Sequence, residues 1–204
     1  SLGAQSKEVI VFTGKAPIIP DPVLLAPETK QNETTEFKDT VAFLYSGSNP
    51  IQKSVIPGTI KEDKLAVVTG RVLDTSGQPI SGAKVSLNQQ GGFGHTFTRA
   101  DGKFDLAVNA GTYTLKYQNA GYISSQRDFT VGVGGYKQEE DIVLVKLSPN
   151  VTPIDMASPV AQLAVGESVS DVRGDRTHVL ITAPQTTATA ILPDGTEQQL
   201  PITS

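Results

Sequence analysis

Histidine is the side chain whose charge changes nearest neutral pH, and this 204-residue chain has two of them, His95 and His178. Beside a carboxylate, either could serve as the general base of a hydrolase. Neither is accompanied by a serine in a nucleophile elbow, and the chain has no cysteine to act as a thiol nucleophile. An exposed histidine on a strand is the favoured interpretation of both. The sequence therefore predicts no catalytic residue and no enzyme.

The residues available for metal or cofactor binding are few. Without cysteine there are no disulfides, thiolate zinc sites or iron–sulfur clusters, and two distant histidines cannot alone supply a three-ligand zinc site. The aspartates near predicted turns, Asp171, Asp175 and Asp194, lack the spacing of a calcium-binding loop and are common turn residues. The glycine-rich stretch Gly91–Gly94 lacks the lysine and the following helix of a phosphate loop. We expect no metal and no cofactor.

Two features of the sequence could recognise a partner. Arg173-Gly174-Asp175 is the tripeptide that integrins bind, although the same composition is ordinary in a turn, which is the interpretation we favour. The aromatic residues Phe93, Phe97 and Tyr136 would favour a carbohydrate-binding sandwich if one exposed face carried them. A cell-surface protein or a glycan therefore stays open as a partner.

The charge balance and the hydropathy exclude two other partner classes. With 17 Lys and Arg against 21 Asp and Glu, the formal net charge is −4, and no basic cluster is present to grip nucleic acid. The longest apolar runs, such as Val9–Phe12 and Val23–Ala26, are far shorter than the roughly 20 residues that span a bilayer. We expect neither nucleic-acid binding nor membrane insertion.

The central part of the chain, residues 63–148, has the pattern of an antiparallel β-sandwich. Short runs of β-branched and aromatic residues alternate with turn residues every 8 to 12 positions, with about seven strands in all. Alternation places Phe104, Leu106 and Val108 on one face, and Asp101-Gly102 marks a hairpin. The predicted strands are Leu65–Leu73, Ala83–Leu87, His95–Arg99, Lys103–Val108, Tyr113–Tyr117, Arg127–Val133 and Asp141–Leu147.

The flanking sections have a different pattern. Residues 1–62 contain four closely spaced prolines, so we expect an extended linker with one or two docked strands, one of them Val41–Tyr45. Residues 149–204 contain further strand-like runs at Ala161–Val165, Thr177–Thr182 and Thr187–Leu192. Three short strands are too few to be stable alone, so they either pack on the central section or begin a second β-rich unit, and we favour the second interpretation.

The central section contains an ordered series of glycine and tyrosine motifs, namely Val68-Thr69-Gly70, Gly82-Ala83, Asp101-Gly102, Gly111-Thr112-Tyr113 and Gly121-Tyr122. This series resembles the carboxypeptidase regulatory-like domain, a seven-stranded sandwich of the transthyretin-like and immunoglobulin-like class. This resemblance implies a non-catalytic stalk, spacer or accessory module. Related adhesin sandwiches form a Lys–Asn crosslink, but the equivalent positions here are Arg71 and Tyr117, so no crosslink is expected.

The flanks contain three further motif-bearing segments, Phe43–Gln52, Pro57–Ile60 and Thr187–Thr196. They resemble the region around the start of the YD (Rhs) repeats in large exported bacterial proteins and in the related teneurins. This resemblance implies an extracellular, non-catalytic structural module whose partners are downstream domains of the same polypeptide. The alternative is a carbohydrate- or protein-binding accessory sandwich of an extracellular enzyme or adhesin.

Overall fold

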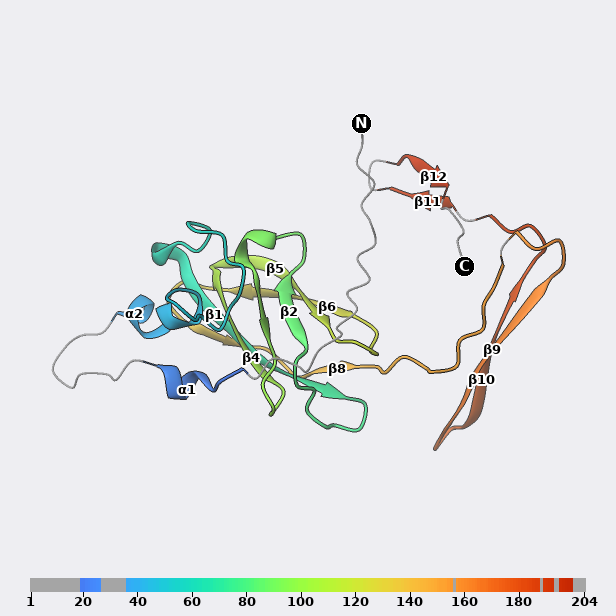
Figure 1. Ribbon diagram of the computed structural model, residues 1–204, viewed down its shortest axis with the longest axis horizontal. Coiled ribbons are helices and arrows are strands. Elements are labelled where there is room, and N and C mark those ends of the chain that lie inside the picture. The colour runs from blue at the N-terminus through green and yellow to red at the C-terminus, as the bar shows by residue number, and fades with distance from the viewer. Residues whose placement is uncertain (1–18, 27–35, 156, 188, 193–194, 200–204) are drawn as a thin grey trace. The chain divides into compact units, whose positions relative to one another are not determined.

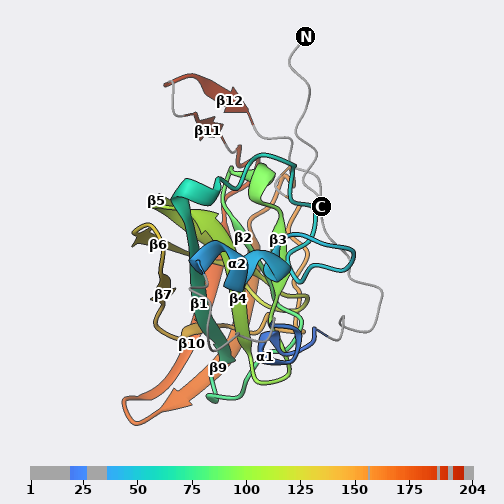
Figure 2. The same ribbon diagram turned by 90° about the vertical axis from the view of Figure 1, so that its left-hand side faces the viewer.

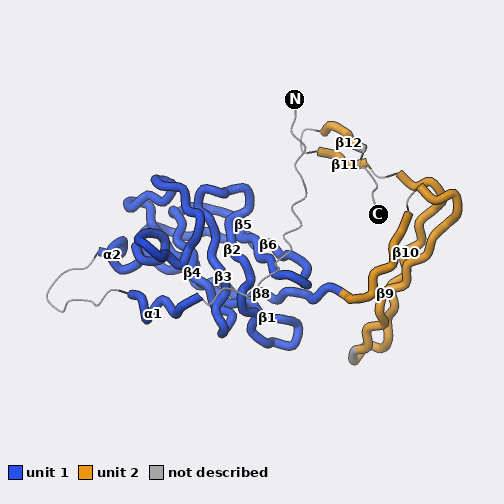
Figure 3. The backbone as a smooth tube through the Cα atoms, viewed as in Figure 1, with its two compact units in different colours: residues 1–147 blue, residues 148–204 orange. Residues whose placement is uncertain are grey.

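The computed structural model describes residues 19–26, 36–155, 157–187, 189–192 and 195–199. It divides into two compact units, residues 1–147 and residues 148–204, which Figure 3 colours separately. Each unit is described by itself below. The predicted features at Val9–Phe12 and at Asp194 lie outside the described residues.

The described part of the first unit holds two β-sheets (Figure 1). One sheet has the order β3-β2-β5-β6, and the other has the order β4-β1-β7, with β8 also paired to β1. The strands are β1 (Leu65–Asp74), β2 (Lys84–Leu87), β3 (His95–Phe97), β4 (Lys103–Asn109), β5 (Gly111–Gln118), β6 (Ser125–Val131), β7 (Tyr136–Gln138) and β8 (Ile142–Leu144). The short helices are α1 (Pro22–Leu25), α2 (Phe37–Val41), η1 (Ala42–Leu44), η2 (Glu62–Lys64) and η3 (Gly91–Phe93).

Alternating apolar side chains hold the two sheets together, as the sequence predicts. Phe104, Leu106 and Val108 of β4 are all buried, as are Leu115 and Tyr117 of β5. The rings of Phe104 and Tyr117, from opposite sheets, meet edge to face with centroids 5.9 Å apart. The predicted all-β sandwich is therefore confirmed, and so are its seven strands to within a few residues at each end.

The predicted Asp101-Gly102 hairpin is only half right. The turn closes, since Arg99 N donates to Lys103 O at 2.9 Å and Asp101 Oδ1 accepts from Lys103 N at 3.0 Å. The strands on either side of it then separate, because β3 pairs with β2 and β4 pairs with β1. The turn is thus a corner that carries the chain from one sheet to the other.

Thr98 fixes this corner. Its buried hydroxyl oxygen accepts from Ala83 N at 2.8 Å and donates to Ile80 O at 2.6 Å. Thr98→Val keeps the shape but leaves both backbone groups unpaired, so we expect the free energy of unfolding to fall by about 2 kcal/mol. Chemical denaturation measures it, with Thr112→Val, an exposed hydroxyl on β5, as the control. Equal effects of the two variants would contradict the assignment.

The strand β7 was not predicted, because its three residues are exposed and follow two glycines. Together β7 and β8 line one edge of β1, with β7 against Val67–Thr69 and β8 against Val72–Asp74. Both run parallel to β1, so the prediction of antiparallel pairing fails along this edge. After β6 the chain crosses from one sheet to the edge of the other. It enters that edge as β7, which runs in the same direction as β1.

The predicted strand at Val41–Tyr45 is wrong, because these residues continue a short helix, α2, into η1. The side chains of Phe37, Val41 and Leu44 are spaced by four and three residues, which places them on one side of a helix. That side packs on the sheet of β1 and β4, where Leu65, Val67 and Ala107 complete a second buried cluster. In Figure 2, α2 lies in front of this sheet.

Residues Gln52 and Lys53 close the open side between the two sheets, where the edge strands β3 and β4 lie. The buried Gln52 amide donates to Phe93 O at 2.6 Å and to Ala107 O at 3.0 Å, and its oxygen accepts from Ala107 N at 2.7 Å. Lys53 exchanges two backbone hydrogen bonds with His95 of β3. We call Gln52 and Lys53 the seam. It attaches the described residues just before it, 36–51, to the sandwich.

The described part of the second unit is a pair of two-stranded ribbons. The first pairs β9 (Gln162–Asp171) with β10 (Gly174–Thr182), and the second pairs β11 (Thr189–Ile191) with β12 (Glu197–Gln199). These confirm strands near the three predicted positions. One face of the longer ribbon carries four aliphatic side chains that are each more than half exposed, namely Leu163, Val165, Val179 and Ile181.

Candidate functional site

The two histidines belong to different units of the chain. His95 lies on β3 of the first unit, where its ring meets Phe97 edge to face at 5.2 Å. His178 is exposed at an irregularity in β10 of the second unit, between Thr177 and Val179. Among the described residues, no three histidine or acidic side chains gather closely enough to hold a metal ion.

Burial, and secondarily the nearby Lys84 ammonium, lowers the pKa of His95 from its ordinary value. A lowered pKa in the folded state means that the unfolded chain binds the proton more tightly. We therefore expect stability to be full above about pH 6.5 and to fall as the pH drops below it. Denaturation between pH 8 and pH 5 tests this, and His95→Gln should lose that part of the pH dependence. An unchanged profile in the variant would contradict it.

The three aromatic residues considered for carbohydrate binding do not share a face. Phe93 lies in the sandwich core and is buried, so it cannot contribute to an exposed aromatic face. Phe97 is half-buried on β3, whereas Tyr136 is exposed on β7 of the other sheet, where its ring packs edge to face against Phe37 at 5.5 Å. Of the tripeptide Arg173-Gly174-Asp175, Arg173 lies in the turn between β9 and β10, whereas Gly174 and Asp175 begin β10.

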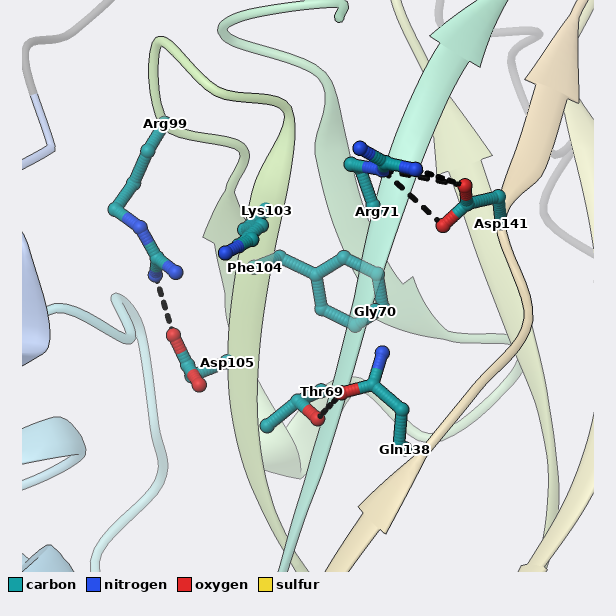
Figure 4. A pocket seen from close by; sticks show the side chains of 9 residues that line it. All are labelled: Thr69, Gly70, Arg71, Arg99, Lys103, Phe104, Asp105, Gln138 and Asp141. Carbon is teal, nitrogen blue, oxygen red and sulfur yellow. Dashed lines mark hydrogen bonds and ion pairs between the residues drawn. The ribbon is translucent and has the colours of Figure 1, made fainter.

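A polar pocket of about 410 Å³ is hollowed into the outer face of the sheet of β4, β1 and β7 (Figure 4). On this outer face, the outward side chains at one end of β1 and β4 are the apolar Leu65, Val67 and Ala107. Residues of α2 and η1 and Ile51 cover them. Farther along the same strands the outward residues become polar and stay open. The pocket residues are Thr69, Gly70, Arg71, Arg99, Lys103, Phe104, Asp105, Gln138 and Asp141.

Two ion pairs flank the pocket. On one side the Arg71 guanidinium donates to both carboxylate oxygens of Asp141, which lies just before β8. The Arg71 hydrogen bond holds the pKa of Asp141 below its ordinary value, and that bond with Asp141 raises the pKa of Arg71. On the other side Arg99 donates to Asp105, and both side chains are largely buried.

Lys103 lies between these pairs, and its side chain is 59% exposed. Its ammonium is 3.9 Å from Asp101 Oδ2, which is beyond hydrogen-bond length. In the register of the sheet Lys103 is directly opposite Arg71, an arrangement of like charges that costs stability. Gly70 leaves room for the Phe104 ring on the inner side of the sheet, where an added Cβ would meet that ring at 2.8 Å.

The comparisons with known proteins agree with this sandwich. Residues 60–144 match a family model described as the teneurin TTR-like domain, which places them in the transthyretin-like class. The sandwich is transthyretin-like. The chain is 28% identical to teneurin-1 of Gallus gallus over 146 residues, which is 68% of this chain, and 28% identical to teneurin-3 of Mus musculus over 161 residues, which is 70% of it. It spans only 5% and 6% of those proteins.

Solved structures add nothing to this assignment. The Bacillus anthracis TIE protein is 14% identical, with a TM-score of 0.36 over 69% of this chain and 31% of its own. A 3-chlorocatechol 1,2-dioxygenase of Rhodococcus opacus is 10% identical, with a TM-score of 0.36 over 46% of this chain and 64% of its own. Likeness at this level carries no argument about activity. In the part of the chain that the structure describes, no helix is long and apolar enough to cross a membrane.

Proposed function

We propose that this chain is a non-catalytic structural module that holds the segments before and after its sandwich at a fixed spacing. The observation that carries the proposal is the seam, because Gln52 bonds to backbone groups next to both sheets. The segment before β1 is thereby fixed to the sandwich, and β8 fixes the chain that leaves it. Such a unit would fix the positions of the neighbouring segments and would carry out no reaction.

The setting we propose is a large exported protein with YD (Rhs) repeats, outside the cell. The similarity to teneurins over two thirds of the chain supports a large parent, and the flanking motifs support the repeats. We propose three parts, an N-terminal section at residues 1–62, the sandwich at 63–148 and the start of another β-rich unit at 149–204. The exposed aliphatic face of the β9–β10 ribbon supports the last part, since such a ribbon is marginal alone.

Rigidity of the first unit tests the spacer role. The chain has no cysteine, so Ser46→Cys and Lys146→Cys introduce two exposed labelling sites, one before β1 and one after β8. Electron paramagnetic resonance between spin labels at these sites should give one narrow distance distribution. A broad distribution in the otherwise folded chain would mean that the N-terminal segment moves independently, and it would overturn the proposal.

A further inference from the structure

The polar pocket on the outer face of the β4-β1-β7 sheet has the properties of a ligand site, and the spacer role does not use it. From its chemistry we infer that it binds an acidic sugar, meaning a monosaccharide unit that carries one carboxylate. This inference stands apart from the proposed function, because a rigid spacer needs no pocket. It rests on charge, on unused hydrogen-bond donors and on size.

The charge of the pocket matches a single carboxylate. Its side chains comprise three cations, Arg71, Arg99 and Lys103, and two carboxylates, Asp105 and Asp141. Among the residues that line the pocket, one positive charge is left over; Asp101 lies outside the lining, with its carboxylate 3.9 Å from Lys103 Nζ and 3.8 Å from Arg99 Nε. The cost of opposing Arg71 and Lys103 across neighbouring strands remains. A ligand carboxylate between them removes that cost. A dianion such as a phosphate ester would be repelled by the two aspartates.

Several N–H donors around the pocket make no hydrogen bond among the described residues. The Arg99 Nε is buried and makes none, and the nearest carboxylate oxygen paired with it, Asp101 Oδ1, is 3.8 Å away. Lys103 Nζ likewise makes no hydrogen bond in the described structure, and Arg71 uses Nε and one terminal nitrogen on Asp141. Unused donors of this kind, beside a hollow, call for a ligand rich in oxygen acceptors.

The remaining wall suits hydroxyl groups rather than a peptide. Thr69 Oγ1 donates to Gln138 Oε1 at 2.8 Å and Gln138 Nε2 donates to Glu139 O at 3.1 Å, which leaves the Thr69 hydroxyl oxygen and the second amide hydrogen of Gln138 at the rim. A volume of about 410 Å³ falls in the range of small-molecule pockets and exceeds what one acidic side chain would fill. An acidic peptide would also need apolar contact area. Apart from Phe104 and Gly70, every residue that lines the pocket has a polar or charged side chain.

The test is a titration of the isotope-labelled 204-residue chain with cellobiouronic acid, a disaccharide with one uronate, followed by nuclear magnetic resonance. The amide signals of Thr69, Gly70 and Gln138 should shift with a saturable curve. Cellobiose, which lacks the carboxylate, should bind at least tenfold more weakly. Equal binding of the two sugars, or no binding of the uronate, would overturn the inference.

Three variants and one peptide complete the test. Lys103→Gln should weaken uronate binding at least tenfold, whereas Lys103→Arg should keep it within about threefold. Lys116→Gln, on β5 of the other sheet, should leave it unchanged. Thermal unfolding checks that all three variants are folded. If the tripeptide acetyl-Gly-Glu-Gly-amide binds more tightly than the uronate, the pocket is a peptide site and the inference is wrong.

Discussion

Replacing Gln52 with alanine should remove about 3–5 kcal/mol from the free energy of unfolding, a large share of the stability of an ordinary domain. The substitution deletes three buried hydrogen bonds. It leaves the Ala107 N–H, the Ala107 carbonyl and the Phe93 carbonyl without partners in a site from which water is excluded. Urea denaturation of the 204-residue chain measures the loss.

Two further variants separate the hydrogen bonds from the loss of volume. Gln126→Ala shortens an exposed glutamine on β6 and should cost less than 0.5 kcal/mol. Gln52→Glu keeps the size but turns a carboxylate oxygen toward two carbonyls. Protonation restores one donor, so its deficit relative to the natural chain should narrow as the pH falls. A Gln52→Ala variant as stable as Gln126→Ala would refute the role of the seam.

Gly94→Ala should also destabilise the protein severely, by about 3 kcal/mol or more. Gly94 has a φ of +66°, and a Cβ there would lie 2.0 Å from Lys53 O and 2.8 Å from Ser54 C. Both contacts are with backbone, so no side-chain rotation can relieve them. The variant must either strain β3 or force the seam away from it. Thermal unfolding and hydrogen exchange at the Lys53 and His95 amides measure the two effects.

Gly77→Ala is the matched control. Gly77 has a similar φ of +76°, but an added Cβ there would meet nothing within 4 Å. It therefore carries only the backbone cost of a left-handed alanine, roughly 1–2 kcal/mol. The difference between the two variants reports the clash with the seam. Equal losses would mean that the close packing of Gly94 against Lys53 is unimportant.

The sandwich could be predicted because its signals are local. Alternation along β4 and β5 and the glycines at turns indicate strands and faces without knowledge of the partners. The short helix at Phe37–Val41 was missed because β-branched and aromatic residues favour strands, whereas here burial against Val67 and Ala107 decides the conformation. Likewise, no residue near Gln52 in the sequence indicates that its amide bonds to the backbone of β4 at Ala107, in the place that a neighbouring strand would take.

The pocket was beyond reach of the sequence for a different reason. Its residues span positions 69 to 141 and come together only through the register of β1 with β4 and with β7. One partial signal was present, since the outward positions of β1 change from Leu65 and Val67 to Thr69 and Arg71. That change shows where the covered part of the face ends. It does not show which cations face each other.

The parallel pairing of β8 with β1 has a mechanical consequence. Because the two strands run the same way, the start of β1 at Leu65 and the end of β8 at Leu144 lie at opposite ends of the sheet edge. Tension applied to the chain at these two ends would pull β1 and β8 past one another along their length. All the hydrogen bonds between the two strands would then have to break at the same time. In an antiparallel pair pulled from neighbouring ends, the hydrogen bonds would instead break one after another from that end.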